Sequence, residues 1–164
     1  MAPTLLIVYH SMTGGTRQMA EAVRDGAVQE GSVAVRLLHA AQALAAEVLG
    51  AHALVLATPE NLAAMSGQLK DFFDRCYYDV LDQVNGRPYA CLVCAGSDGQ
   101  GAVRQIERIA TGWRLRRVAE PLVVCTHAQT REAILAPKHI APQELARCRA
   151  LGEALAAGLA LGVF

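Results

Sequence analysis

Five short apolar segments, separated by stretches with helical periodicity, constrain the fold more than any other feature of this sequence. Each segment is apolar almost throughout, whereas a strand with one solvent-exposed face alternates apolar and polar residues. Both faces of these strands should therefore be covered by other parts of the chain. Strands covered on both faces are typical of parallel sheets. We therefore predict a parallel five-stranded sheet, with strands at residues 4–9, 33–37, 53–57, 88–94 and 121–125.

The stretches between these segments carry apolar residues three and four positions apart, which is the spacing of a helix with one buried face. Strands and helices that alternate through right-handed crossovers form a doubly wound α/β sheet in three layers. Ligands of such folds bind outside the carboxyl ends of the strands, so the loops after the first, third and fourth strands should carry the function. The predicted helical faces are Met19, Ala20, Val23 and Ala27; Leu69, Phe72, Phe73, Cys76 and Val80; Val103, Ile106 and Ile109; Leu145, Cys148, Leu151, Leu155 and Leu159; and a weaker, alanine-rich case at residues 40–49.

Length and charge narrow the class of protein. A chain of 164 residues with 53% apolar residues is long enough for one buried core, so we expect a single domain over residues 1–164. The chain has 15 basic and 15 acidic residues, a balance that favours neither a nucleic-acid nor a membrane-surface partner. Its apolar runs are too short to cross a bilayer and its start lacks a basic signal-peptide segment. We expect a cytoplasmic protein with no nucleic-acid or membrane partner.

The five cysteines are odd in number and scattered among apolar neighbours, which favours reduced, buried thiols over a disulfide framework. Cys91 and Cys94 form a C-x-x-C pair inside a predicted strand. Residues three apart in a strand point to opposite faces, whereas a metal or redox pair needs both sulfurs on one side. We therefore predict no metal site.

The loop after the first strand has the composition of an anion-binding loop. Its two glycines allow a ligand to approach the backbone closely, its hydroxyls offer hydrogen bonds, and the start of the following helix favours negative charge. The loop contains no lysine, unlike an NTP-binding P-loop, and it lacks the G-x-G-x-x-G pattern of dinucleotide-binding folds. The alternative is that its hydroxyls only cap the helix and its glycines only make a turn. The loop residues are Ser11, Met12, Thr13, Gly14, Gly15 and Thr16.

These residues resemble a known family. Ser11-x-Thr13-Gly14-x-Thr16 matches the S/T-x-T-G-x-T phosphate loop of flavodoxins and flavodoxin-like FMN oxidoreductases. The segment at residues 58–72 resembles the T-P-x-x-x-G-x-M-x-x-Q-x-K-x-F segment of NAD(P)H:quinone oxidoreductases. The resemblance implies a flavodoxin-like sheet with strand order 2-1-3-4-5, and FMN as the cofactor.

The resemblance also implies which loops contact the flavin ring. One loop would run along the ring edge and the other would cover its pyrimidine side. The chain departs from the family in three places, the first being Ala63 and Ala64, which stand where a glycine and a polar residue are common. Leu62 stands where an aromatic residue is common, and the fourth-strand loop has no stacking tyrosine, so one ring face should be open. The implied ring-binding residues are Thr58, Pro59, Glu60, Asn61, Leu62 and Ala63 in the first loop, and Ala95, Gly96, Ser97, Asp98 and Gly99 in the second.

Two functions follow from the resemblance. The first is an enzyme in which NAD(P)H reduces FMN by hydride transfer and the flavin passes electrons to a quinone, a flavin or a similar small acceptor; no side chain need act as catalyst, because the cofactor carries the chemistry. The second is a one-electron carrier or an accessory FMN-binding module. The apolar last helix and C-terminus suggest a possible homodimer, and the irregular residues 126–142 suggest a lid or a subunit contact.

Overall fold

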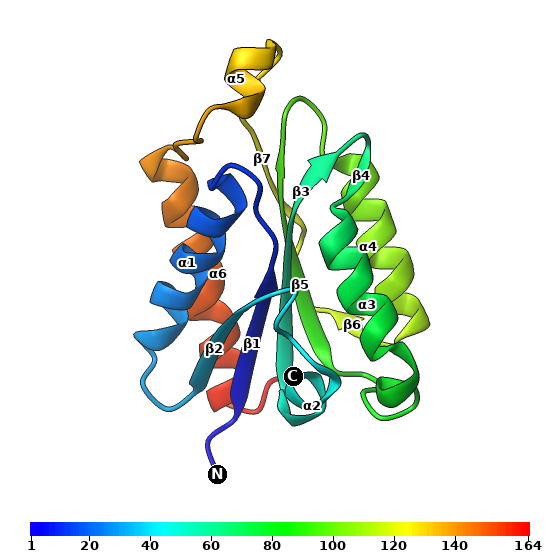
Figure 1. Ribbon diagram of the computed structural model, residues 1–164. Coiled ribbons are helices and arrows are strands. Elements are labelled where there is room, and N and C mark those ends of the chain that lie inside the picture. Colours follow the sequence, from blue (N-terminus) through cyan, green and yellow to red (C-terminus); the bar gives the residue numbers. More distant parts are fainter.

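The computed structural model describes all residues from Met1 to Phe164 and contains a twisted, mostly parallel sheet between two layers of helices (Figure 1). The strands are β1 (Thr4–Tyr9), β2 (Ala34–His39), β3 (Ala53–Asn61), β4 (Ala64–Met65), β5 (Pro88–Ala95), β6 (Arg116–Arg117) and β7 (Leu122–Cys125). The helices are α1 (Gly15–Val28), α2 (Ala45–Gly50), α3 (Gly67–Val80), α4 (Gln100–Gly112), α5 (Arg131–Leu135) and α6 (Pro142–Ala160).

The strand order confirms the predicted flavodoxin-like topology. The strands lie in the order β2-β1-β3-β5-β6, and β7 pairs with the same edge of β5 further along it. If β6 and β7 are taken as two pieces of the fifth strand, the order is the predicted 2-1-3-4-5. The prediction of one continuous fifth strand at 121–125 was incomplete, because residues 118–121 stand opposite only Ala90 and Cys91 and interrupt the pairing.

Besides shifts of one or two residues at strand ends, three features differ from the prediction. Strand β3 continues beyond Ala57 to Asn61 and turns back into β4, forming a small antiparallel hairpin. Helix α2 covers only the second half of the alanine-rich stretch at 40–49. Helix α5 lies within residues 126–142, where no helix was predicted. No helix has both the length and the apolar character needed to cross a membrane.

Two apolar cores lie on opposite faces of the sheet, as three layers require. Helices α1 and α6 cover one face, and helices α2, α3 and α4 cover the other (Figure 1). Phe72, Phe73 and Trp113 pack edge-on and tilted in the second core. Cys91 lies in that core and Cys94 lies in the first, so the predicted opposite orientation of the C-x-x-C pair is confirmed.

Candidate functional site

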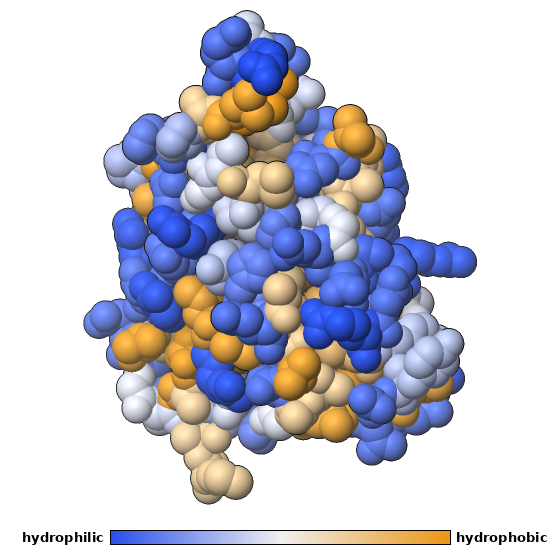
Figure 2. Space-filling model, in the orientation of Figure 1, coloured by the Kyte–Doolittle hydropathy of each residue, from blue (hydrophilic) through white to orange (hydrophobic).

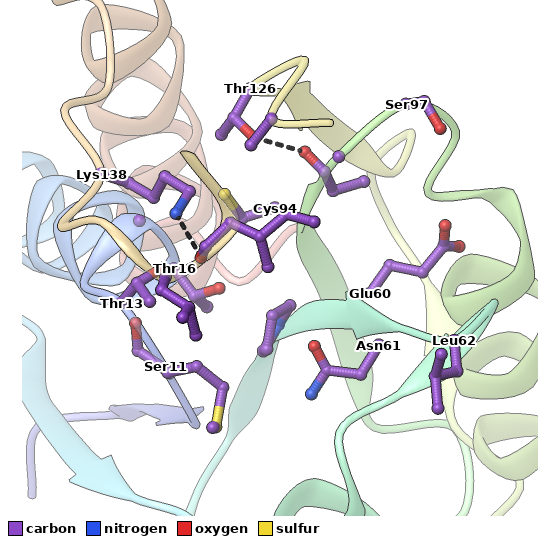
Figure 3. A pocket seen from close by; sticks show the side chains of 18 of the residues that line it. Ser11, Thr13, Thr16, Glu60, Asn61, Leu62, Cys94, Ser97, Thr126 and Lys138 are labelled. Atoms are coloured by element: carbon purple, nitrogen blue, oxygen red, sulfur yellow. Dashed lines mark hydrogen bonds between the residues drawn. The ribbon is translucent and has the colours of Figure 1, made fainter. Parts of the chain in front are cut away.

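A cavity of about 560 Å³ opens at the carboxyl ends of β1, β3 and β5. Figure 3 shows that residues of the three predicted loops surround it from different sides. Figure 2 shows the hollow on the molecular surface beneath the projecting α5, with apolar atoms on the underside of that helix. Twenty residues line the cavity: Ser11, Met12, Thr13, Gly15, Thr16, Pro59, Glu60, Asn61, Leu62, Ala63, Cys94, Ala95, Gly96, Ser97, Thr126, Ala128, Gln129, Ile134, Leu135 and Lys138.

Most of the predicted site residues meet at this cavity, and four do not line it. Gly14 and Gly99 have left-handed backbones, with φ of 93° and 88°, and each directly precedes a helix. Thr58 is fully buried, and its hydroxyl accepts from the Ser66 amide and donates to the Pro59 carbonyl. The Asp98 carboxylate faces the Gln100 amide at 3.4 Å. These four residues shape the loops around the cavity.

The phosphate loop leaves several donors without a partner. The Ser11 hydroxyl accepts from the Gly14 amide at 3.1 Å, and because Gly14 precedes the helix, this bond closes the loop and does not cap α1. Helix α1 has no side-chain cap, and no hydrogen bond uses the amides of its first three residues. The Thr16 hydroxyl is buried, with the residue 1% exposed, and has no hydrogen-bond partner. A buried hydroxyl without a partner is unfavourable unless a ligand supplies one.

Gly15, the first residue of α1, has no room for a side chain above the floor of the cavity. A Cβ atom at Gly15 would lie 2.7 Å from the Cys94 sulfur. Burial raises the pKa of the Cys94 thiol to about 11, and the nearby Lys138 opposes that rise. Cys94 is therefore a neutral thiol at pH 7 and packs beneath the loop without acting as a nucleophile.

The β3–β4 hairpin forms the opposite wall through a strained turn. Its two central residues, Leu62 and Ala63, have φ of 52° and 62°, which a two-residue type I′ turn requires and which Asn-Gly usually supplies. The left-handed conformation costs roughly 1–2 kcal/mol for a residue other than glycine. Leu62 projects fully into solvent beside the cavity (Figure 3). The strain therefore lies at the edge of the site.

Glu60 joins the two loops that were predicted to hold the ring. Its carboxylate accepts from the Gly99 amide at 2.9 Å and from the Ala102 amide at 3.1 Å. Gly99 directly precedes α4 and provides no side-chain cap. Glu60, in β3, caps this helix instead, and its negative charge is favourable at the helix N-terminus. A Cβ at Gly101 would lie 2.0 Å from the Ala63 carbonyl oxygen, so α4 packs directly on the hairpin backbone.

Residues 126–142 form an arch over the cavity and supply the lining residues that sequence reasoning missed. At the first foot, the amides of Thr126 and His127 donate to the carbonyls of Ala95 and Gly96 at 2.9 and 2.8 Å. At the second foot, the Lys138 amide donates to the Thr13 carbonyl at 2.9 Å. Helix α5 lies between the feet and projects from the body of the molecule (Figure 1). The arch therefore links the phosphate loop to the fourth-strand loop.

Gln18 fixes the second foot. Its side-chain nitrogen donates to the carbonyls of Gly14 and Lys138 at 3.0 and 2.7 Å, and its side-chain oxygen accepts from the Ile140 amide at 3.0 Å. All three partners are backbone groups, two of them on the arch. No local pattern marks Gln18 as a residue that holds the arch, because its two partners there are 120 and 122 residues away.

Two histidines, His10 and His127, lie next to the site without lining the cavity. His10 is buried beside β1, does not line the cavity, and packs edge-on against His39 with ring centroids 5.5 Å apart. Burial lowers the pKa of His10, and His39 lowers it further. His127 lies at the first foot of the arch with a left-handed φ of 57° and lines a separate hollow of about 550 Å³. Neither imidazole faces the main cavity.

The residues of the cavity fit FMN. The volume lies within the range of small-molecule sites. The unpartnered Thr16 hydroxyl and the free amides of α1 suit a phosphate at one end. Backbone from the hairpin and from residues 95–97 lines the other end, where a flat ring can approach closely.

Comparison with known proteins agrees with this assignment. Residues 34–130, more than half of the chain, match the family model described as NADPH-dependent FMN reductase. The match includes the hairpin, the fourth-strand loop and the first foot of the arch, and it begins after the phosphate loop.

One curated relative and two solved structures carry the name flavodoxin. A protein named flavodoxin from Aquifex aeolicus is 34% identical over 97 residues, which is 59% of this chain and 50% of the relative, so the match spans half of that protein. An archaeal flavodoxin structure has a TM-score of 0.77 at 19% identity and covers 96% of this chain and 99% of its own. A flavodoxin, WrbA-like protein from Agrobacterium tumefaciens has a TM-score of 0.74 at 18% identity, covering 98% and 99%. The chain therefore belongs to the NADPH-dependent FMN reductase family and is a flavodoxin-like flavoprotein.

Proposed function

We propose that the protein is an oxidoreductase that uses NAD(P)H to reduce FMN held in the cavity, and that electrons then pass to a small acceptor such as a quinone or a free flavin. The observation that carries this proposal is the composition of the cavity wall. No Phe, Tyr, Trp or His is among its lining residues. A flavin there would have no aromatic residue stacked on it, so one ring face can receive a nicotinamide or a planar acceptor.

The residues of the chain would bind and orient the cofactor. Ser11, Thr13 and Thr16 would hold the phosphate with the amides of the first turn of α1. Backbone groups of residues 61–63 and 95–97 would address the ring edge. Bound FMN would supply the hydride-accepting chemistry, and no side chain is assigned as a catalytic acid or base.

The second candidate is a one-electron carrier or an accessory FMN-binding module. It is supported by the name of the Aquifex aeolicus relative and by the structural likeness to flavodoxins. The chain has a formal net charge of zero, which provides little electrostatic steering towards an oppositely charged protein partner. This charge balance favours the enzyme.

One reduction experiment separates the two candidates. The protein is reconstituted with FMN, freed of excess cofactor, and titrated anaerobically with NADH or NADPH while the visible flavin band is recorded. If the protein is the enzyme, the visible flavin band should bleach within one turnover time. The flavin should be fully reduced by two electrons, and no half-reduced flavin should accumulate. If FMN is retained but neither nucleotide reduces it, whereas dithionite produces a persistent half-reduced state, the carrier is correct.

Cofactor binding is tested separately, by titrating the apoprotein with FMN up to millimolar concentration. Absence of binding would contradict both candidates. The cavity would then need another phosphate-containing ligand.

A further inference from the structure

Lys138 places a positive charge at the phosphate end of the cavity, although the phosphate loop itself contains no lysine. The chain has only two lysines. Lys70 lies exposed on α3, with its nitrogen 2.7 Å from the Asp74 carboxylate. Lys138 lies in the arch and lines the cavity together with Thr13 and Thr16 (Figure 3). Its position thus comes from the fold and not from the loop sequence.

The backbone of Lys138 is fixed against the phosphate loop. Its amide donates to the Thr13 carbonyl at 2.9 Å, and its carbonyl accepts from the Gln18 side chain at 2.7 Å. The Cβ of Lys138 lies 3.4 Å from the position that a Cβ would take at Gly15. The residue therefore adjoins the first turn of α1, where the unpartnered amides and the buried Thr16 hydroxyl lie.

The ammonium group is held in place and has a donor left over. It donates to the carbonyls of Ile134 and Ala136 at 2.8 and 2.7 Å, which leaves one of its three N–H groups free. No carboxylate forms an ion pair with it. A half-buried cation without an anionic partner, next to an unpartnered buried hydroxyl, is the arrangement expected where an anion binds.

We propose that Lys138 is the counter-ion of the FMN phosphate and that it makes the site select the phosphorylated flavin over riboflavin. The proposal rests on the proposed function, because it requires FMN in the cavity. A phosphate monoester carries close to two negative charges at pH 7, and the hydroxyls and amides of the loop are all neutral. A charge-assisted hydrogen bond from Lys138 would neutralise part of that charge and would act on FMN alone.

The test compares two flavins that differ only by the phosphate. FMN and riboflavin are titrated against the apoprotein of the wild type, Lys138→Met and Lys138→Arg by flavin fluorescence. Lys138→Met should weaken FMN binding on the order of tenfold or more, the strength of a charge-assisted bond, and leave riboflavin binding unchanged. Lys138→Arg should restore most of the affinity for FMN. Lys70→Met, the matched removal of the other lysine, should change neither.

Salt provides a second readout. Added NaCl should weaken FMN binding more in the wild type than in Lys138→Met, because screening acts on the ion pair that the variant lacks. Equal FMN affinity in wild type and Lys138→Met overturns the proposal while leaving FMN binding intact. Equal loss of both flavins also overturns it and assigns Lys138 to the structure of the arch. A wild type that binds neither flavin contradicts the proposed function and the counter-ion role together.

Discussion

The side chain of Gln18 holds the backbone of Lys138 across 120 residues of sequence, with its nitrogen 2.7 Å from the Lys138 carbonyl oxygen. With its further bonds to Gly14 and Ile140, this one amide joins the phosphate loop to the arch. The wall of the cavity that the arch supplies therefore depends on a residue of α1.

We predict that Gln18→Leu loosens the arch without unfolding the sheet. The variant fills similar space but leaves the Lys138 carbonyl and the Ile140 amide without partners, so the arch should open more often. Hydrogen exchange measured by mass spectrometry should become faster in residues 126–142 and stay unchanged in β1 and β3. Gln68→Leu makes the same change in the first turn of α3, where the side chain is exposed, and serves as control. Unchanged exchange in the arch would show that Gln18 does not hold it.

We predict that Thr16→Val weakens FMN binding and does not lower the free energy of unfolding. The Thr16 hydroxyl is buried without a partner, so removing it loses no hydrogen bond within the protein. A ligand phosphate would lose one hydrogen bond, an expected effect of about 1 kcal/mol or somewhat more. Equilibrium titration with FMN and urea unfolding of the apoprotein measure the two quantities. An unchanged FMN dissociation constant would place the phosphate elsewhere.

Ala63→Gly should stabilise the protein. Ala63 has φ of 62° and an exposed side chain, so glycine removes backbone strain and loses little packing. We expect the free energy of unfolding to rise by about 1 kcal/mol, the strain relieved minus the greater entropy of glycine in the unfolded chain. Ala41→Gly is the matched control, because Ala41 is also exposed and lacks a positive φ, and it should destabilise slightly. Urea unfolding compares the signs, and a loss of stability in Ala63→Gly would contradict the strained turn.

Stability should fall in mild acid because of His10. Burial, and then His39, hold the pKa of His10 below its ordinary value in the folded state, so the unfolded chain takes up this proton more readily. The stability from neutral His10 is therefore full above the unfolded pKa of about 6.5 and is lost as the pH falls through the lower folded pKa. His10→Phe keeps a ring against His39 and should flatten this decline. Urea unfolding over this pH range gives both profiles, and parallel profiles would exclude His10 as the cause.

The strands of the sheet and the phosphate loop could be predicted because the sequence patterns that indicate them are local. The continuous apolar runs of β1, β3 and β5 indicate strands buried on both faces, and the hydroxyls and glycines at 11–16 identify the loop by its composition. Each of these two signals is carried by residues that are adjacent in the sequence. The strand order and most of the cavity lining follow from the topology once those strands are known.

The arch could not be predicted because its position is set by contacts between distant residues. Lys138 meets Thr13 through backbone atoms, and a backbone contact leaves no residue type to recognise. The five-residue α5 is too short for a periodic apolar pattern, and none of its residues is buried. The left-handed turn at Leu62 was missed for a related reason, since neither it nor Ala63 is a residue that typically marks such turns.

Glu60 provides the last prediction, which concerns the chemistry of a bound flavin. Its carboxylate lies at the cavity and is held by the Gly99 and Ala102 amides, so its negative charge is fixed beside the predicted ring position. Reduction adds electrons to the flavin, and a nearby negative charge opposes this step. Glu60→Gln should therefore raise the midpoint potential of bound FMN. It should also lower the free energy of unfolding by about 1 kcal/mol or more, because the amide nitrogen cannot accept the second hydrogen bond.

Glu107→Gln is the matched control for both effects. Glu107 lies further along α4, pairs with Arg117 at the surface and does not line the cavity. Anaerobic reduction against a reference dye gives the potential, and urea unfolding of the apoprotein gives the stability. A potential that is equal in Glu60→Gln and the wild type, with lowered stability, would limit Glu60 to capping α4. A raised potential in Glu60→Gln but not in Glu107→Gln would place the flavin ring within the electrostatic field of this carboxylate.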